Sequence, residues 1–213
     1  SNLLNFTRQE FDVYEQRLLI LIIEFLKHKQ GIGVDIEEGK NLEVSLNYAD
    51  FEKDISSNRL KKLANTITSQ KIHYEVSEDK WTYLVLFPMV SYESGELKVT
   101  IIDKALKYLL ELAKGYTNID KQSIFSLKSS ISMRMYELLM SFKNVGVWTV
   151  KIEELRELLN LAHNQYINFK DFRIRVLEYS QRELWEHCNL HFEWEVATKK
   201  RKKITALTFH IKE

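Results

Sequence analysis

Residues 190–211 read "LHFEWEVATKKRKKITALTFHI", and their pattern predicts a β-hairpin with a basic tip. A period of two is typical of half-buried strands. Apolar residues occupy every second position on both sides of the basic run, at Leu190, Phe192, Trp194 and Val196 and again at Leu207, Phe209 and Ile211. The basic run itself consists of Lys199, Lys200, Arg201, Lys202 and Lys203. Because five like charges repel one another, the cluster predicts a negatively charged partner.

Length and composition predict a folded protein of one large domain or two smaller ones. The chain has 213 residues, of which 45% are hydrophobic and 12% aromatic, enough to build a core. The net charge of +1 favours no particular partner, but it is unevenly distributed. Residues 1–110 carry 14 basic and 17 acidic side chains, a balance of −3, whereas residues 111–213 carry 17 and 13, a balance of +4.

Cysteine content and hydropathy predict a cytoplasmic location. Cys188 is the single cysteine, which excludes an internal disulfide and fits a reducing compartment. The apolar run "LLILII" at 18–23 is far shorter than the roughly 20 residues that a membrane span requires. We therefore expect no membrane association, and we expect this run to form a helix that is buried on more than one side.

The two halves of the chain predict the same order of elements: helix, strand, helix, helix, hairpin. In the first half these are residues 8–28, 42–46, 48–55, 59–71 and a hairpin of strands 72–76 and 81–92. In the second half they are residues 123–144, 147–152, 153–160, 169–187 and the hairpin at 190–211. A repeat of about 100 residues indicates an internal duplication.

This order is that of a winged helix, a helix-turn-helix followed by a β wing. We therefore predict an α+β fold of two tandem winged-helix domains. Their expected bounds are 1–102 for the N-terminal domain, 103–121 for a partly helical linker, and 122–213 for the C-terminal, DNA-binding domain.

Helix 169–187 is the candidate recognition helix, because the later helix of such a pair enters the major groove. Its first two turns carry Lys170, Arg173 and Arg175. The planar guanidinium of arginine matches guanine O6 and N7, or a phosphate, through two hydrogen bonds. In an isolated helix these residues would more simply form a solvated face with Arg–Glu pairs. The adjoining basic hairpin favours double-stranded DNA as the partner.

Two other groups of residues give weaker hypotheses. The string H-C-x-x-H at 187–191 lacks a second pair with zinc-ligand spacing. Glu93, Glu96 and Lys98 resemble the acidic and lysine residues of a metal-dependent nuclease, but a charged turn explains them more simply. The chain also lacks the G-x-x-x-x-G-K-[ST] motif of ATP-binding phosphate loops. We predict no enzyme activity, no cofactor and no bound metal.

Several ordered motifs run through residues 123–211. They are S-x-R-x-Y-E-L-L at 132–139, E-E-L-R at 153–156, Tyr166, and "DFRIRVL" at 171–177, followed by the basic wing and an apolar strand. With these motifs the second half resembles the Rep initiator family of iteron-bearing bacterial plasmids, which has two winged-helix domains. The first half matches by its element order and by its opening "FTRQEFDVYEQRLLILII". The wing lacks the glycine that often precedes the basic pair in this family.

The resemblance implies a non-catalytic initiator of plasmid replication. Such proteins bind direct repeats, called iterons, in the origin, help to open the adjacent duplex and recruit host replication proteins. A winged-helix transcription regulator, a metal-dependent nuclease and a module that binds only proteins are the alternatives.

For the first domain, the resemblance implies homodimerisation. The apolar helix at 13–26 fits such an interface, and it fits ordinary packing between the domains equally well. The helix that corresponds to the recognition helix carries Arg59, Lys61 and Lys62, which predicts a second DNA contact.

Overall fold

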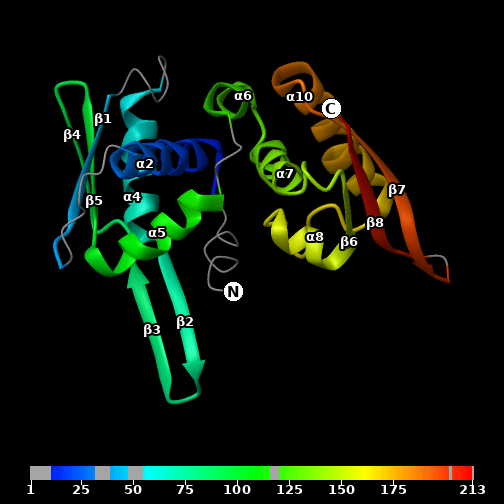
Figure 1. Cartoon of the computed structure of the whole chain (residues 1–213), viewed down its shortest axis with the longest axis horizontal. Coiled ribbons are helices and arrows are strands. Elements are labelled where there is room, and N and C mark those ends of the chain that lie inside the picture. Colours follow the sequence, from blue (N-terminus) through cyan, green and yellow to red (C-terminus); the bar gives the residue numbers. More distant parts are fainter. Residues whose placement is uncertain (1–10, 32–38, 48–54, 116–119, 202, 213) are drawn as a thin grey trace. The chain divides into compact units, whose positions relative to one another are not determined.

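The structure, a computed structural model, describes residues 11–31, 39–47, 55–115, 120–201 and 203–212 (Figure 1). The chain divides into two compact units, Ser1–Thr117 and Asn118–Glu213. Within the described residues, no helix is both long enough and apolar enough to cross a membrane.

Unit 1 contains one three-stranded sheet, one separate hairpin and three described helices. In chain order the elements are α2 (Val13–Gly31), β1 (Leu42–Asn47), α4 (Ser57–Ser69), β2 (Lys71–Ser77), β3 (Lys80–Val85), β4 (Met89–Glu93), β5 (Glu96–Ile101) and α5 (Asp103–Gly115). The antiparallel sheet has the order β1-β5-β4, with Val99 opposite both Val44 and Val90. The helix expected at 48–55 lies almost entirely outside the described residues.

Helix α2 is buried by elements of its own unit, because it contacts α4, α5 and β1. Side chains 18–23 are all buried, and Leu26 is fully buried one turn later. Asp12 caps the helix: its Oδ1 accepts hydrogen bonds from the backbone N–H groups of Tyr14 and Glu15, while Glu15 Oε2 accepts one from Asp12 N–H. The apolar run is therefore part of the core of unit 1.

The expected hairpin of the first half was partly wrong. Strands β2 and β3 pair with each other and form a separate hairpin that extends beyond the three-stranded sheet (Figure 1). The predicted strand 81–92 is interrupted by Leu86 and Phe87, which are fully buried, and by Pro88, which has no N–H for a sheet ladder. The chain resumes as β4 and pairs with β5, a strand that the sequence did not indicate. The wing of unit 1 is therefore β4–β5.

Unit 2 repeats this sheet with β6-β8-β7 in place of β1-β5-β4. Its elements are α6 (Lys121–Ser126), α7 (Ser130–Ser141), β6 (Val147–Lys151), α8 (Ile152–Leu158), α9 (Phe169–Phe172), the π-helical turn η1 (Arg173–Glu178), α10 (Tyr179–Cys188), β7 (His191–Lys200) and β8 (Lys203–Lys212). In both units the first strand pairs with the last, and the last pairs with its predecessor. The common order fits the predicted duplication, with β2–β3 inserted before the wing of unit 1.

Two segments differ from the expected helix boundaries. The helix predicted at 123–144 is two helices, because Leu127 enters the core between them and Ser129 caps α7 by accepting a hydrogen bond from Ser132 N–H. Within the expected linker 103–121, residues 103–115 form α5, which packs on α2. Ala105, Leu106 and Leu109 of α5 are buried, so this helix contributes to the core of unit 1.

Candidate nucleic-acid interface

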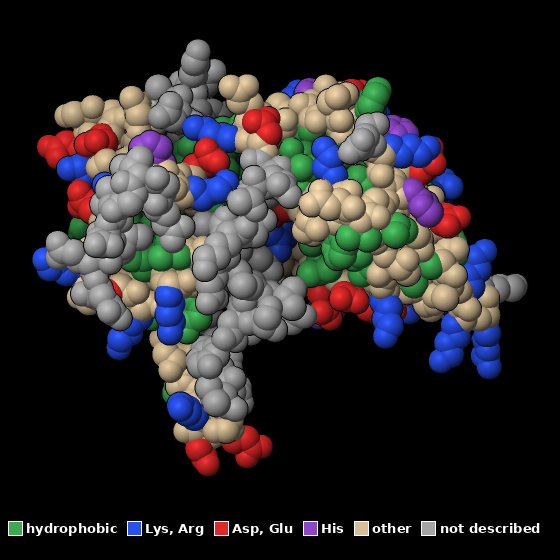
Figure 2. Space-filling view, in the orientation of Figure 1, with side chains coloured by type: hydrophobic (Ala, Val, Ile, Leu, Met, Phe, Trp, Pro, Cys, Tyr) green, Lys and Arg blue, Asp and Glu red, His purple; other side chains and the backbone are tan. Residues whose placement is uncertain are grey.

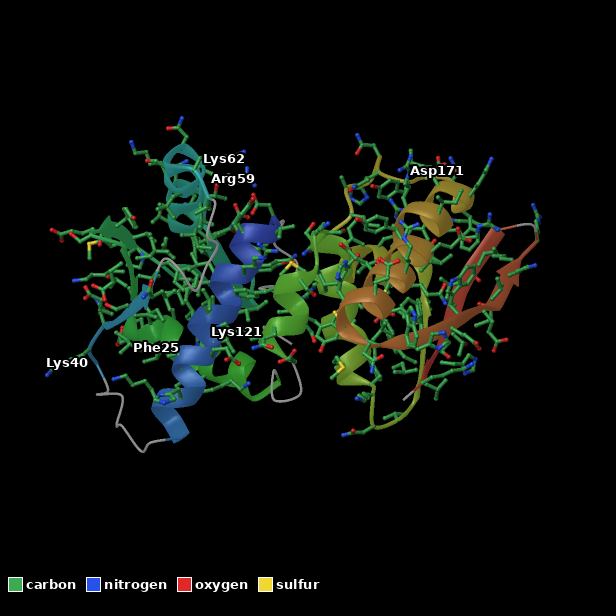
Figure 3. All side chains as sticks on the ribbon, turned by 90° about the horizontal axis from the view of Figure 1, so that it is seen from above. Phe25, Lys40, Arg59, Lys62, Lys121 and Asp171 are labelled. Carbon is green, nitrogen blue, oxygen red and sulfur yellow. The ribbon has the colours of Figure 1, made fainter. Side chains whose placement is uncertain are left out.

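The candidate recognition helix of unit 2 follows one path through α9, η1 and α10. Asn168 caps its start by accepting a hydrogen bond from Asp171 N–H over 2.8 Å; Figure 3 labels Asp171 at this end of the helix. The ring of Phe169 packs edge-on against Trp194 of β7, with 6.3 Å between the centroids. The start of the recognition helix is therefore fixed against the strand that leads to the basic wing.

The middle of this helix is π-helical, which the sequence pattern did not indicate. Phe172, Val176 and the adjacent Leu177 are all buried, a combination that widens the buried face of the helix. Arg173 Nε lies 3.3 Å from Glu178 Oε1, five residues later, which is the spacing of one π turn. A π turn is often found at functional positions of helices.

All three predicted cations of the recognition helix reach the solvent. Lys170, Arg173 and Arg175 are exposed on α9 and η1. The ion pair of Arg173 with Glu178 joins side chains that are 45% and 47% exposed, so it is weak and can exchange for a contact with DNA. The three cations are therefore accessible on the first two turns of the helix, and their role in DNA binding stays a prediction.

The basic wing is the turn between β7 and β8, and Figure 2 shows Lys and Arg side chains gathered at its tip. Lys199, Lys200 and Arg201 are exposed, and Lys202 lies outside the described residues. Arg201 has a φ of 57°, a conformation that favours glycine. The register of the hairpin shifts on both sides of Thr198, and such bulges bend and twist a hairpin.

Lys203 of the wing has an acidic partner, Glu153. Its Nζ lies 3.2 Å from Oε1 of Glu153 at the start of α8. The pKa of Glu153 is lowered, first by its own backbone N–H at the helix start and then by Lys203. Both side chains are more than half exposed, so the ion pair contributes little to stability. It does reduce the positive charge that the wing offers to DNA.

A groove of about 470 Å³ joins the recognition helix to the wing. Its lining includes Phe169 and Phe172 from the helix, Lys203 and Ile204 from the wing, and Glu153 from α8. The start of the recognition helix and the base of the wing therefore lie on either side of one small groove. Of the predicted cations, the described lining includes Lys203.

Arg156 fixes the loop that leads into the recognition helix, a role that sequence reasoning missed. Its guanidinium donates hydrogen bonds to the carbonyl oxygens of Ala162, Gln165 and Tyr166. The guanidinium carbon also lies 5.8 Å from the centroid of the Phe172 ring. The E-E-L-R motif singles out this arginine, but backbone carbonyl partners leave no signal in the side-chain sequence.

The S-x-R-x-Y-E-L-L motif connects the helices behind this surface. Arg134 forms an ion pair with Glu137 on α7, at side-chain exposures of only 11% and 9%. Arg134 Nε also donates a hydrogen bond to Leu158 O at the end of α8, over 3.1 Å. Ser132 Oγ lies 3.4 Å from Ser180 Oγ of α10. The motif therefore holds both helices of the helix-turn-helix against α7.

In unit 1 the three predicted cations lie on α4 but differ in their surroundings. Lys61 and Lys62 are exposed. Arg59, labelled with Lys62 in Figure 3, instead binds Asp12, with 2.5 Å between Nη2 and Oδ2. Its guanidinium also lies 4.6 Å from the centroid of the Tyr14 ring. Arg59 thus links α4 to the start of α2.

The residues of the nuclease hypothesis lie in unit 1, and those of the zinc hypothesis lie in unit 2. Glu93 and Glu96 flank the β4–β5 turn, and Lys98 Nζ lies 4.0 Å from Glu96 Oε2. Cys188 donates a hydrogen bond to Ser123 O, while the ring of His191 packs against Trp185. Among the residues that the structure describes, no three His, Cys, Asp or Glu side chains are grouped to hold a metal ion.

Comparison with known proteins shows the family. A model of "Initiator Replication protein, WH1" matches residues 1–140, and a model of "Initiator Rep protein, WH2" matches residues 151–211. Among solved structures, the chain is similar to the Pi initiator protein in complex with iteron DNA, with 17% identity, a TM-score of 0.69, and coverage of 98% of this chain and 93% of that chain. No curated protein matches it significantly. The predicted family and fold class are confirmed, and the chain belongs to the initiator replication proteins with two winged-helix domains, WH1 and WH2.

Proposed function

We propose that this protein initiates plasmid replication by binding direct repeats of the origin in a sequence-specific way. It then promotes opening of the adjacent duplex and recruits host replication proteins. Membership of the initiator family supports this proposal, as does the fold shared with the Pi initiator protein, which was solved with iteron DNA. Its place of action is the bacterial cytoplasm, where plasmid DNA lies.

Two exposed basic elements of unit 2, the recognition helix and the wing, are the observation that carries the proposal. They offer different chemistry to one duplex. The wing presents Lys199, Lys200 and Arg201, which suit phosphates and carry little sequence information. The helix presents Arg173 and Arg175, whose guanidinium groups suit guanine edges in the major groove. Phosphate contacts position the protein, and base contacts select the site.

We also propose that unit 1 touches DNA through Lys61 and Lys62, which are exposed on the helix that corresponds to the recognition helix. Arg59 contributes less, because Asp12 and Tyr14 already bind its guanidinium. Two linked modules on one site gain effective concentration, so the weaker module still adds affinity. Homodimerisation through unit 1 would instead present two half-sites in inverted orientation.

Footprinting on the plasmid that encodes the protein tests the proposal. The expected result is protection of tandem repeats beside the gene, over about two helical turns per repeat if both units bind. Protection of one turn by the full-length monomer would show that unit 1 does not contact DNA. Random and repeat duplexes bound with equal affinity would contradict the proposed function, and magnesium-dependent nicking of the plasmid would favour the nuclease alternative.

A further inference from the structure

Ile174 is an apolar side chain on the exposed face of the recognition helix. It is 38% exposed, whereas Phe172, Val176 and Leu177 on either side of it are at most 1% exposed. These three residues pack in the core, whereas Ile174 lies at the surface. Arg173 and Arg175 are the two sequence neighbours of Ile174. Lys170 precedes Ile174 by four residues, which is about one helical turn.

This surface is unsuited to the phosphate backbone alone. Ile174 offers no hydrogen-bond donor, and Glu178, four residues later, is 47% exposed and would repel phosphates. Base edges have the matching chemistry, because the major groove presents guanine acceptors to arginine and the C5-methyl group of thymine to apolar side chains. The mixture of arginine and isoleucine therefore matches a site with guanine next to thymine.

We propose that Ile174 is a specificity-determining residue that contacts the C5-methyl group of a thymine, beside a guanine bound by Arg173 or Arg175. The inference rests on the proposed function, since it requires that this helix enters the major groove. It adds one apolar contact to the polar readout. The contact distinguishes thymine from the other three bases, none of which carries that methyl group.

Replacing thymine by deoxyuridine tests the contact, because the exchange removes only the methyl group. Each thymine of the protected repeat is exchanged singly, and the dissociation constant is measured for wild type and for Ile174→Ala. We expect one position at which wild type binds the uracil duplex roughly fourfold more weakly, the effect of one buried methyl group. At that position Ile174→Ala should bind the two duplexes equally, as a double-mutant cycle requires for a direct contact.

Val145→Ala is the matched control, since Val145 is another exposed apolar residue of unit 2, at 68%, and lies outside the recognition helix. This variant should keep the full uracil effect. Circular dichroism and unchanged affinity for random duplex report that Ile174→Ala is folded. The inference is overturned if no uracil position affects wild type, or if Ile174→Ala keeps the same uracil effect. A wild-type protein without preference for the repeats would overturn the proposed function as well.

Discussion

At the scale of single residues, the wing tip combines DNA-binding chemistry with an unfavourable backbone. Arg201 has a φ of 57°, where a side chain costs roughly 1–2 kcal/mol relative to glycine. We predict that Arg201→Gly stabilises the β7–β8 hairpin relative to Arg201→Ala, while both variants weaken DNA binding to the same extent. Hydrogen exchange of β7 and β8 measures the first effect and a binding titration the second. Equal exchange in the two variants would contradict the prediction.

Glu153 offers a second test at this scale, because its carboxylate lies 3.2 Å from Lys203 Nζ. Glu153→Gln removes the acidic partner, so Lys203 becomes available to a phosphate. We expect tighter binding to random duplex and a salt dependence that is steeper by about one unit on the log–log plot. Glu154→Gln is the matched control, since Glu154 is the neighbouring exposed carboxylate of α8. The same log–log salt slope for both variants would argue that the ion pair with Glu153 does not weaken phosphate binding by Lys203.

At the scale of elements, Arg134 of α7 joins two contacts. It forms a largely buried ion pair with Glu137 and donates a hydrogen bond to the end of α8. Glu137→Gln leaves Arg134 charged at 11% exposure without its carboxylate. Breaking a buried pair in this way typically costs roughly 3–5 kcal/mol. We expect a loss of unfolding free energy near the lower end of this range, because Arg134 keeps its hydrogen bond to Leu158 O. Urea unfolding followed by tryptophan fluorescence measures it, and a loss below about 1 kcal/mol, the range of exposed pairs, would show that the pair is solvated.

Helix α2 carries a pH-dependent contribution to stability through Glu15. Burial, above all, raises the pKa of Glu15 above its ordinary value of 4.5, and the charge of Asp12 also raises it. The folded state therefore holds the proton more tightly, and the contribution of Glu15 to stability is lost as pH rises through the raised pKa. Glu15→Gln should gain stability relative to wild type as the pH rises from about 4 to about 7. Hydrogen exchange of α2 in wild type and in Glu15→Gln, at both pH values, measures this gain in stability. A difference between the two proteins that does not change with pH would contradict the prediction.

Elements with local sequence signals were predictable, whereas features that depend on distant contacts were not. Strict alternation in residues 190–211 was sufficient for β7 and β8. The interruption at Pro88 and the pairing of β5 with β1, which are far apart in the chain, leave no local pattern. The π turn at Arg173–Glu178 leaves no signal in the apolar pattern, because the buried Phe172, Val176 and Leu177 also fit one face of an ordinary α-helix. Charge alone identified the exposed cations, but the partners of Arg59 and Lys203 are distant in sequence.

At the scale of the whole molecule, we propose that the two basic elements of unit 2 have different tasks. The recognition helix selects bases, and the wing holds phosphates. In this proposal, unit 1 adds affinity or a dimer surface but does not replace either element. Family membership applies to both units, since the two family models match residues 1–140 and 151–211. The central claim is therefore a division of labour within unit 2 that mutations can separate.

Salt-dependent binding titrations of two kinds of variant test this claim most directly. Alanine at all five positions 199–203 should weaken binding to repeat and random duplexes alike, and it should flatten the log–log salt dependence by about one unit for each phosphate interaction removed. Arg173→Ala or Arg175→Ala should cost roughly 1–3 kcal/mol on the repeat only and leave random DNA nearly unaffected. Uniformly weaker binding by the arginine variants, or an unchanged salt slope in the wing variant, would contradict the division of labour.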